Sequence, residues 1–176
     1  MTMTLIETKV LGTAQASIEF TSIPQTYTDL LFVASCRTDR AAIDDPILIQ
    51  INGGSTAASN RRLRGSGSAV VSQNSSIDGN YYWFSVGGSS TASTFDNASI
   101  YFPNYAGNTN KSFSIDGVGE NNATTAFQTI TAGLWANTAA ITSVKFQSDL
   151  GTNLVAGTTI SLYGITKGTD GIVVVS

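Results

Sequence analysis

Polar and apolar residues alternate along most of this chain with a period of two. In 14–20 and again in 98–102, every second residue is apolar and its neighbours are mostly polar. This spacing is typical of strands that have one face in a core and the other in solvent. No stretch shows the three-and-four spacing of an amphipathic helix. The pattern therefore predicts an all-β protein.

Clusters of Gly, Asn, Ser and Asp separate the apolar runs and divide the chain into about ten strands. A polar, glycine-rich segment between Ser55 and Asn80 holds two shorter candidates, and Asp29–Cys36, apolar on both faces, is expected to lie centrally. We expect one domain over 1–176, an antiparallel β-sandwich. The two shorter candidates are Arg61–Arg64 and Ala69–Ser72. The other expected strands are Leu5–Val10, 14–20, Asp29–Cys36, Pro46–Asn52, Tyr81–Val86, 98–102, Ser112–Asp116, Ala126–Ala136, Thr138–Gln147, Thr158–Thr166 and Ile172–Val175.

Charge is scarce, which changes the picture of the surface. Charged residues make up 12% of the 176 residues, about half of the roughly 25% usual in soluble domains. A surface of hydroxyls, amides and backbone suits a protein that is packed in an assembly, with a neutral-surfaced monomer as the alternative. The net charge of −3 gives no basic surplus for nucleic acid.

The residue types exclude most catalytic chemistry. The chain has no His and one Cys, which removes Ser–His–acid catalysis and zinc sites. Adjacent Asp44 and Asp45 would point to opposite faces of a strand, so they form no acid pair for glycoside hydrolysis. We expect no enzyme, no cofactor and no metal. Calcium ligands in 78–80 and at Asp116, Glu120 and Asn121 are the weaker alternative, because turn chemistry accounts for these residues.

Three further features bear on location and redox chemistry. No apolar run approaches the roughly 20 residues of a membrane span, and the first residues lack a signal peptide. We therefore expect synthesis in a cytoplasm and no membrane association. Cys36 ends an apolar run and is interpreted as a small buried residue, since no His is present to activate it.

Two clusters are candidate contacts with a partner. Arg61, Arg62 and Arg64 form the main charge cluster, either a clamp on acidic side chains or an edge strand protected by charge. Tyr81 and Trp83 share one strand face in an aromatic run and could lie at an interface or stack on a sugar. Burial of both faces of that run in the core is the alternative.

Three segments resemble virion proteins of tailed bacteriophages. They are the opening (Leu5–Thr8 with Ser17–Leu30), the stretch Gly133–Val144 and the ending Ala156–Ile165, which contains Ser-Leu-Tyr-Gly-Ile. The resemblance implies a jelly-roll-like sandwich carried on the particle, and it transfers no functional residues. Within the last segment, Leu162 should face one side of the sheet and Tyr163 and Ile165 the other, while Gly164 permits close approach of a neighbouring strand or a bulky side chain.

The leading expectation is a capsid decoration, or cement, protein. Its partners would be the major capsid protein and copies of itself, as a homo-oligomer, and its location would be the virion. The alternative is a tail-fibre or baseplate module that binds host glycans, with aromatic residues near Tyr81–Trp83 and at Tyr101 and Tyr105 as the sugar platform.

Overall fold

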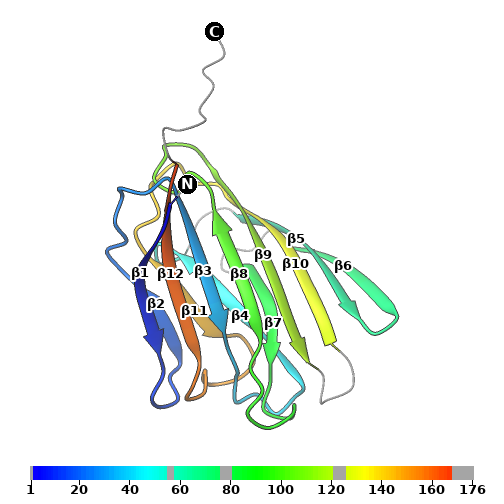
Figure 1. The fold of residues 1–176 in the computed structure, drawn as a ribbon. Coiled ribbons are helices and arrows are strands. Elements are labelled where there is room, and N and C mark those ends of the chain that lie inside the picture. The colour runs from blue at the N-terminus through cyan, green and yellow to red at the C-terminus, as the bar shows by residue number, and fades with distance from the viewer. Residues whose placement is uncertain (1, 55–57, 76–80, 121–125, 168–176) are drawn as a thin grey trace.

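The fold consists of strands joined by turns and loops (Figure 1). The computed structural model describes residues 2–54, 58–75, 81–120 and 126–167. Within them, no helix is long and apolar enough to cross a membrane. The strands are β1 (Thr2–Val10), β2 (Ser17–Phe20), β3 (Asp29–Ser35), β4 (Asp44–Ile51), β5 (Ala58–Ser66), β6 (Ala69–Ser75), β7 (Tyr81–Val86), β8 (Asn97–Phe102), β9 (Lys111–Glu120), β10 (Ala126–Trp135), β11 (Val144–Ser148) and β12 (Thr159–Thr166).

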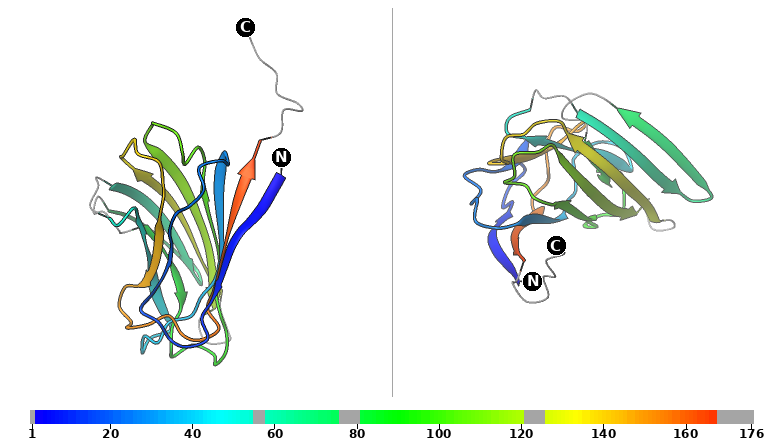
Figure 2. Two further views of the ribbon diagram at one scale, coloured as in Figure 1. Left: turned by 90° about the vertical axis from the view of Figure 1, so that its left-hand side faces the viewer. Right: turned by 90° about the horizontal axis from the view of Figure 1, so that it is seen from above.

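Two antiparallel sheets pack face to face as a β-sandwich (Figure 2). The small sheet has the order β2-β11-β4-β7, and one half of the large sheet has the order β1-β12-β3-β8. These eight strands follow the jelly-roll arrangement, in which consecutive strands alternate between the sheets except at β4 and β7, which pair within the small sheet. The fold class expected from the sequence is confirmed, and β3 lies inside the large sheet as expected.

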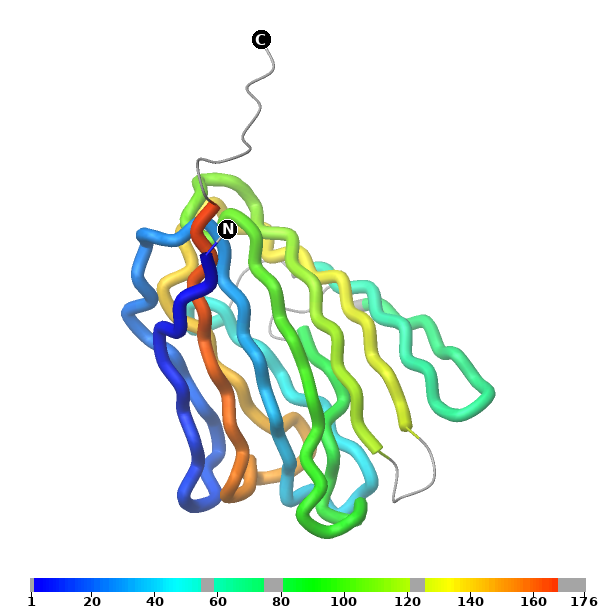
Figure 3. Tube along the Cα trace, viewed as in Figure 1, coloured from blue at the N-terminus to red at the C-terminus, as the bar shows by residue number. Residues whose placement is uncertain are grey.

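Two inserted hairpins extend the large sheet beyond the jelly roll. The connection from β4 to β7 contributes β5 and β6, and the connection from β8 to β11 contributes β9 and β10. The hairpins pair with each other through β10 and β5, which gives the order β8-β9-β10-β5-β6. The turn of the β5–β6 hairpin projects at the right-hand side of Figure 3.

The core is aromatic and lies between the two sheets. Phe32 of β3 contacts Phe20, Phe102 and Phe146 edge-on, with ring centroids 5.2–6.0 Å apart. Such tilted contacts are the favoured geometry of aromatic pairs. Cys36 lies in the same core, which confirms its interpretation as a small buried residue. Burial raises the pKa of its thiol.

A buried arginine fixes the loop that leads into β8. The Arg37 guanidinium, at the end of β3, donates hydrogen bonds to the carbonyls of Gly88, Ser90, Thr91 and Thr94, at 2.7–3.3 Å. These hydrogen bonds take the place of those with water that the cation loses when it is buried. The loop between β7 and β8 is therefore held by a side chain that follows β3, the neighbour of β8 in the large sheet.

Several strand boundaries differ from the sequence expectations. Ala14 and Ala16 are exposed and precede the strand, which begins at Ser17. Residues 138–143 form a loop, because the Asn52 carboxamide oxygen accepts hydrogen bonds from the backbone of Thr142 and Ser143. The expected strand Ile172–Val175 lies outside the described residues.

Candidate interaction surface

The β5–β6 hairpin turns two arginines toward the inside of the molecule. In the register of β5 with β10, Arg62 lies opposite Thr131 and Arg64 opposite Thr129. Both threonines are fully buried, so this row faces inward. The Thr131 hydroxyl donates to the carbonyl of Tyr82, at 3.0 Å. The extended large sheet thus curves over β7, the edge strand of the small sheet.

The two arginines stack on aromatic rings of β7. The Arg62 guanidinium lies 3.8 Å from the ring centroid of Tyr82, and the Arg64 guanidinium 3.8 Å from that of Phe84. Arg64 also forms an ion pair with Asp44. Burial lowers the pKa of Arg62 and raises that of Tyr82. Cation–π contacts gain strength when water is excluded, so these side chains hold the hairpin against the small sheet.

The candidate partner contacts predicted from the sequence are largely internal. Arg62 is buried and Arg64 half-buried, whereas Arg61 on the opposite face of β5 is exposed. The arginine run also lies on a strand that is paired on both sides, and the edge strand is β6. Neither the clamp nor the charge-protected edge describes Arg62 and Arg64, which instead anchor the hairpin.

Tyr81 and Trp83 are core residues rather than surface residues. Both are fully buried, and each donates one internal hydrogen bond. The Tyr81 hydroxyl donates to the carbonyl of Leu134 at 2.6 Å, and the Trp83 indole N–H donates to the Asp96 carboxyl group at 2.6 Å. The aromatic run is therefore core on one face and covered by arginines on the other, so these two residues offer no surface to a partner.

The surface feature that the sequence analysis missed is an apolar patch at the extended end of the large sheet. We call Leu63, Val70, Val118 and Ile130 the outer patch; all four are exposed. The register aligns β9, β10, β5 and β6, with Ile130 directly opposite Leu63. These residues are scattered among polar neighbours in the sequence, so only the strand pairing reveals that they share a face.

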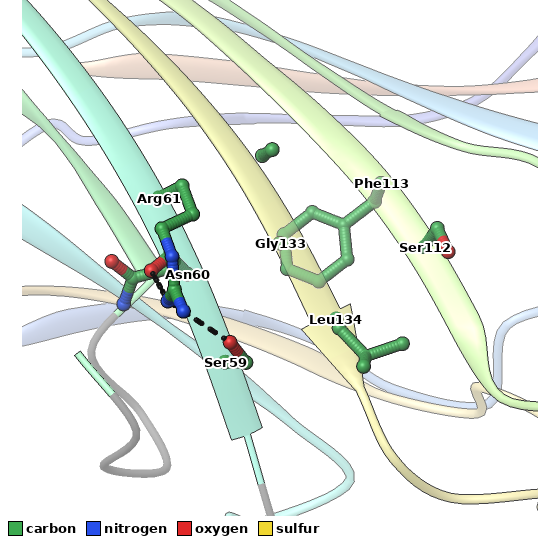
Figure 4. A pocket seen from close by; sticks show the side chains of 8 residues that line it. Ser59, Asn60, Arg61, Ser112, Phe113, Gly133 and Leu134 are labelled. Atoms are coloured by element: carbon green, nitrogen blue, oxygen red, sulfur yellow. Dashed lines mark hydrogen bonds between the residues drawn. The ribbon is translucent and has the colours of Figure 1, made fainter. Parts of the chain in front are cut away.

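A small hollow is lined by residues of β5, β9 and β10, three of the strands that carry the outer patch (Figure 4). Its volume of about 260 Å³ falls below the roughly 300–1,000 Å³ typical of small-molecule sites. The Arg61 guanidinium at its rim donates to the Asn60 carbonyl at 2.8 Å and to the Ser59 hydroxyl at 3.3 Å. The residues that line it are Ser59, Asn60, Arg61, Ser112, Phe113, Ala132, Gly133 and Leu134.

Three acidic residues in the described segments accept hydrogen bonds from neighbouring strands and loops. The Asp45 carboxylate accepts hydrogen bonds from the backbone of Leu150 and Gly151 at 3.1 and 3.2 Å. Glu120 accepts from the Thr91 backbone at 3.0 Å, and Asp116 accepts from Gln128 at 3.2 Å. Among the described residues, no three His, Cys, Asp or Glu side chains gather to hold a metal ion. The calcium candidates in 78–80 and at Asn121 lie outside those residues.

Loss of one inward arginine should loosen the hairpin. We expect Arg62→Ala to lower the free energy of unfolding by about 1–2 kcal/mol, because stacking and buried stem contacts are lost. Hydrogen exchange should rise across β5 and β6. The matched control is Arg61→Ala on the exposed face of the same strand, with an expected change within about 0.5 kcal/mol. Equal effects of the two substitutions would contradict the anchoring role.

Comparison with known proteins found no matching family model, no matching curated protein and no matching solved structure.

Proposed function

We propose that this chain is a non-enzymatic virion structural protein of a tailed bacteriophage, a decoration protein that binds the outer surface of the major capsid lattice and stabilises the head. The observation that carries the proposal is the outer patch, an exposed apolar surface on the large sheet. Contiguous apolar surface of this kind is typical of protein–protein contacts. The resemblance of three segments to phage virion proteins supplies the identity of the partner.

The outer face of the large sheet suits such a contact. One register-aligned row across the sheet carries a single charged side chain, together with three hydroxyl and three apolar side chains. Burial of this face would remove apolar area from water at about 25 cal/mol per Å², with few charges to desolvate. Repetition over a lattice adds avidity to weak single contacts. The row consists of Ser161, Val33, Ser99, Asp116, Ile130, Leu63 and Ser72.

The remaining parts of the proposal concern location, partners and cofactors. The protein would be made in the host cytoplasm and end in the virion, with the major capsid protein and copies of itself as partners. It needs no cofactor and no nucleic acid for this role.

Quantitative mass spectrometry of purified particles tests the location. We expect hundreds of copies per virion, in proportion to the major capsid protein. A count of about three to a few dozen would place the protein on the tail instead. Absence from particles would overturn the proposal.

Binding to capsids stripped of the protein tests the surface. Ile130→Asp combined with Leu63→Asp should abolish binding, because two carboxylates would be buried against the lattice. Leu150→Asp is the matched control, since Leu150 is equally exposed but lies after β11, away from the outer patch. Unchanged binding by the double variant would contradict a contact through the outer patch.

No observation favours the glycan-binding alternative. Its expected sugar platform is inside the molecule, because Tyr81, Trp83 and Tyr105 are fully buried. Tyr101 is half-buried, and its hydroxyl donates to Asp29 at 2.7 Å. That hydrogen bond raises the pKa of Tyr101 to about 12. We therefore keep the glycan-binding module only as the interpretation that a low, tail-like copy number per virion would support.

A further inference from the structure

The β6 strand is an open edge of the large sheet. Each of the other edge strands is blunted in a recognised way. β1 carries a register shift between Leu5 and Glu7, β2 has four residues, and β7 lies under the arginines of the hairpin. Within the described residues, no strand pairs with the outer side of β6. An unprotected edge is a template for pairing with another strand.

β6 also lacks the residues that usually protect an edge strand from association. The strand, Ala69–Ser75, contains no charged residue and no proline. Val70 is 74% exposed and Val71 49% exposed. Natural edge strands usually carry a lysine, a proline or a bulge against association. The absence of all three along this strand indicates that pairing is used rather than avoided.

The turn of the hairpin fixes which backbone groups of β6 point outward. Gly67, with φ +64°, and Ser68 join β5 to β6, so Ser66 and Ala69 close a two-residue turn. The residues that flank such a turn bond to each other, and bonded and non-bonded pairs then alternate. The outward N–H and C=O groups are therefore those of Val70, Ser72 and Asn74.

We propose that two copies of the chain pair through β6, antiparallel, about a two-fold axis at Ser72. In this register Ser72 lies opposite Ser72 of the second copy, and Val70 opposite Asn74 of the second copy. All three outward residues of each strand then find hydrogen-bond partners. The geometry favours a second copy because the same uncharged strand supplies both halves, so no like charges meet. The pairing is isologous, as in most homodimers.

The proposed pairing joins the outer patches of the two copies on one face. A two-fold axis perpendicular to the sheet keeps Val70 and Leu63 of both copies on the same side. Arg61 lies one strand in from the edge and faces Asn74. Two neighbouring arginine strands would be about 14 Å apart, three strand spacings, and salt screens charges beyond about 10 Å. Repulsion between the arginines is therefore weak.

Paired charges at Val70 and Asn74 test the register. The purified wild-type chain should be a dimer by light scattering after size exclusion. Val70→Lys with Asn74→Lys places like charges opposite each other at both pairs and should give a monomer. Val70→Lys with Asn74→Glu places opposite charges there and should remain a dimer. Both positions are exposed, and circular dichroism checks that each variant folds.

Each other outcome overturns the proposal. A monomeric wild-type chain at about 100 μM would mean that β6 does not pair at affinities typical of stable complexes. A dimeric double-lysine variant would place the contact elsewhere. A monomeric Lys/Glu variant would refute the register. These measurements use the isolated chain, so they do not depend on the proposed capsid function.

A cysteine at the proposed axis provides an independent test. Ser72→Cys should form a disulfide-linked dimer on mild oxidation, because opposed residues in an antiparallel pair have Cα atoms about 5.5 Å apart. Val70→Cys is the control, since two copies of residue 70 would lie about 14 Å apart. The natural Cys36 is buried and does not compete. Equal cross-linking by the two variants would contradict the axis at Ser72.

Discussion

Asp96→Ala is expected to lower the free energy of unfolding by about 4 kcal/mol at pH 5. The buried Asp96 carboxyl group accepts hydrogen bonds from the Cys36 backbone N–H at 2.5 Å and from the Trp83 indole N–H at 2.6 Å. It thereby joins the end of β3 to β7 and to the start of β8. Alanine leaves two buried donors without partners, and each costs about 1–3 kcal/mol. Chemical denaturation followed by tryptophan fluorescence measures the effect.

The same group should make stability fall as pH rises. Burial raises the pKa of Asp96 to about 7, even though hydrogen bonds from Cys36, Trp83 and Ser85 lower it. The unfolded chain has an aspartate pKa of about 3.9, so between these values only the folded state holds the proton. Stability therefore decreases from about pH 4 to pH 7 and is then level, with a total loss of about 4 kcal/mol.

Asp96→Asn isolates this contribution from those of other titrating groups. The amide keeps the shape but cannot ionise, and it loses one of the two acceptor positions. The stability advantage of the wild type over this variant should therefore shrink as pH rises from 4 to 7. A difference between the two proteins that does not change with pH would mean that Asp96 is ionised in the fold.

Gly164→Val is expected to lower the free energy of unfolding by about 3 kcal/mol. A Cβ atom at Gly164 would meet Cγ, Cδ1 and Cδ2 of Tyr27, the rigid base of the ring rather than its free end. Gly164 lies in β12, which is paired on both sides by β1 and β3. Neither strand can retreat, so the ring must leave its place, and overpacking of this kind typically costs about 1–3 kcal/mol.

Two further variants show whether the ring is the cause. In a Tyr27→Ala background, the cost of Gly164→Val should fall below about 1 kcal/mol, because the clash is gone. Gly65→Ala is the matched control in another strand: nothing lies within 4 Å of its Cβ position, so the change should be neutral or slightly stabilising. An undiminished cost in the Tyr27→Ala background would contradict the steric explanation.

Several strands could be read from the sequence close to their observed bounds, but the full length of β9 could not. Tyr81–Val86 was predicted with its observed bounds. The strand expected over Ser112–Asp116 continues instead to Glu120, through the buried Gly117 and Gly119. The rings of Trp83 and Phe127 occupy the space that side chains at these glycines would fill. A glycine in a core position breaks the apolar pattern without breaking the strand.

The candidate surface was predictable only in part. Period-two spacing places Arg62 and Arg64 on one face of a strand and Arg61 on the other. It does not say which face is inside, and arginine is rarely buried. The two arginines stack on aromatic rings of β7, a strand of the small sheet. Only the curvature of the large sheet brings β5 next to β7. By contrast, the close approach expected at Gly164 is confirmed, because a local glycine in an apolar strand carries its own signal.

The extension of the large sheet has a consequence for how this fold could have evolved. Its two hairpins come from separate connections, yet β5 pairs with β10 along nine residue pairs. Loss of the β5–β6 hairpin would strip β10 of that partner and would uncover Tyr82 and Phe84, while loss of β9–β10 would leave β5–β6 with no sheet to join. The two insertions therefore depend on each other, and natural variants should keep both or lack both.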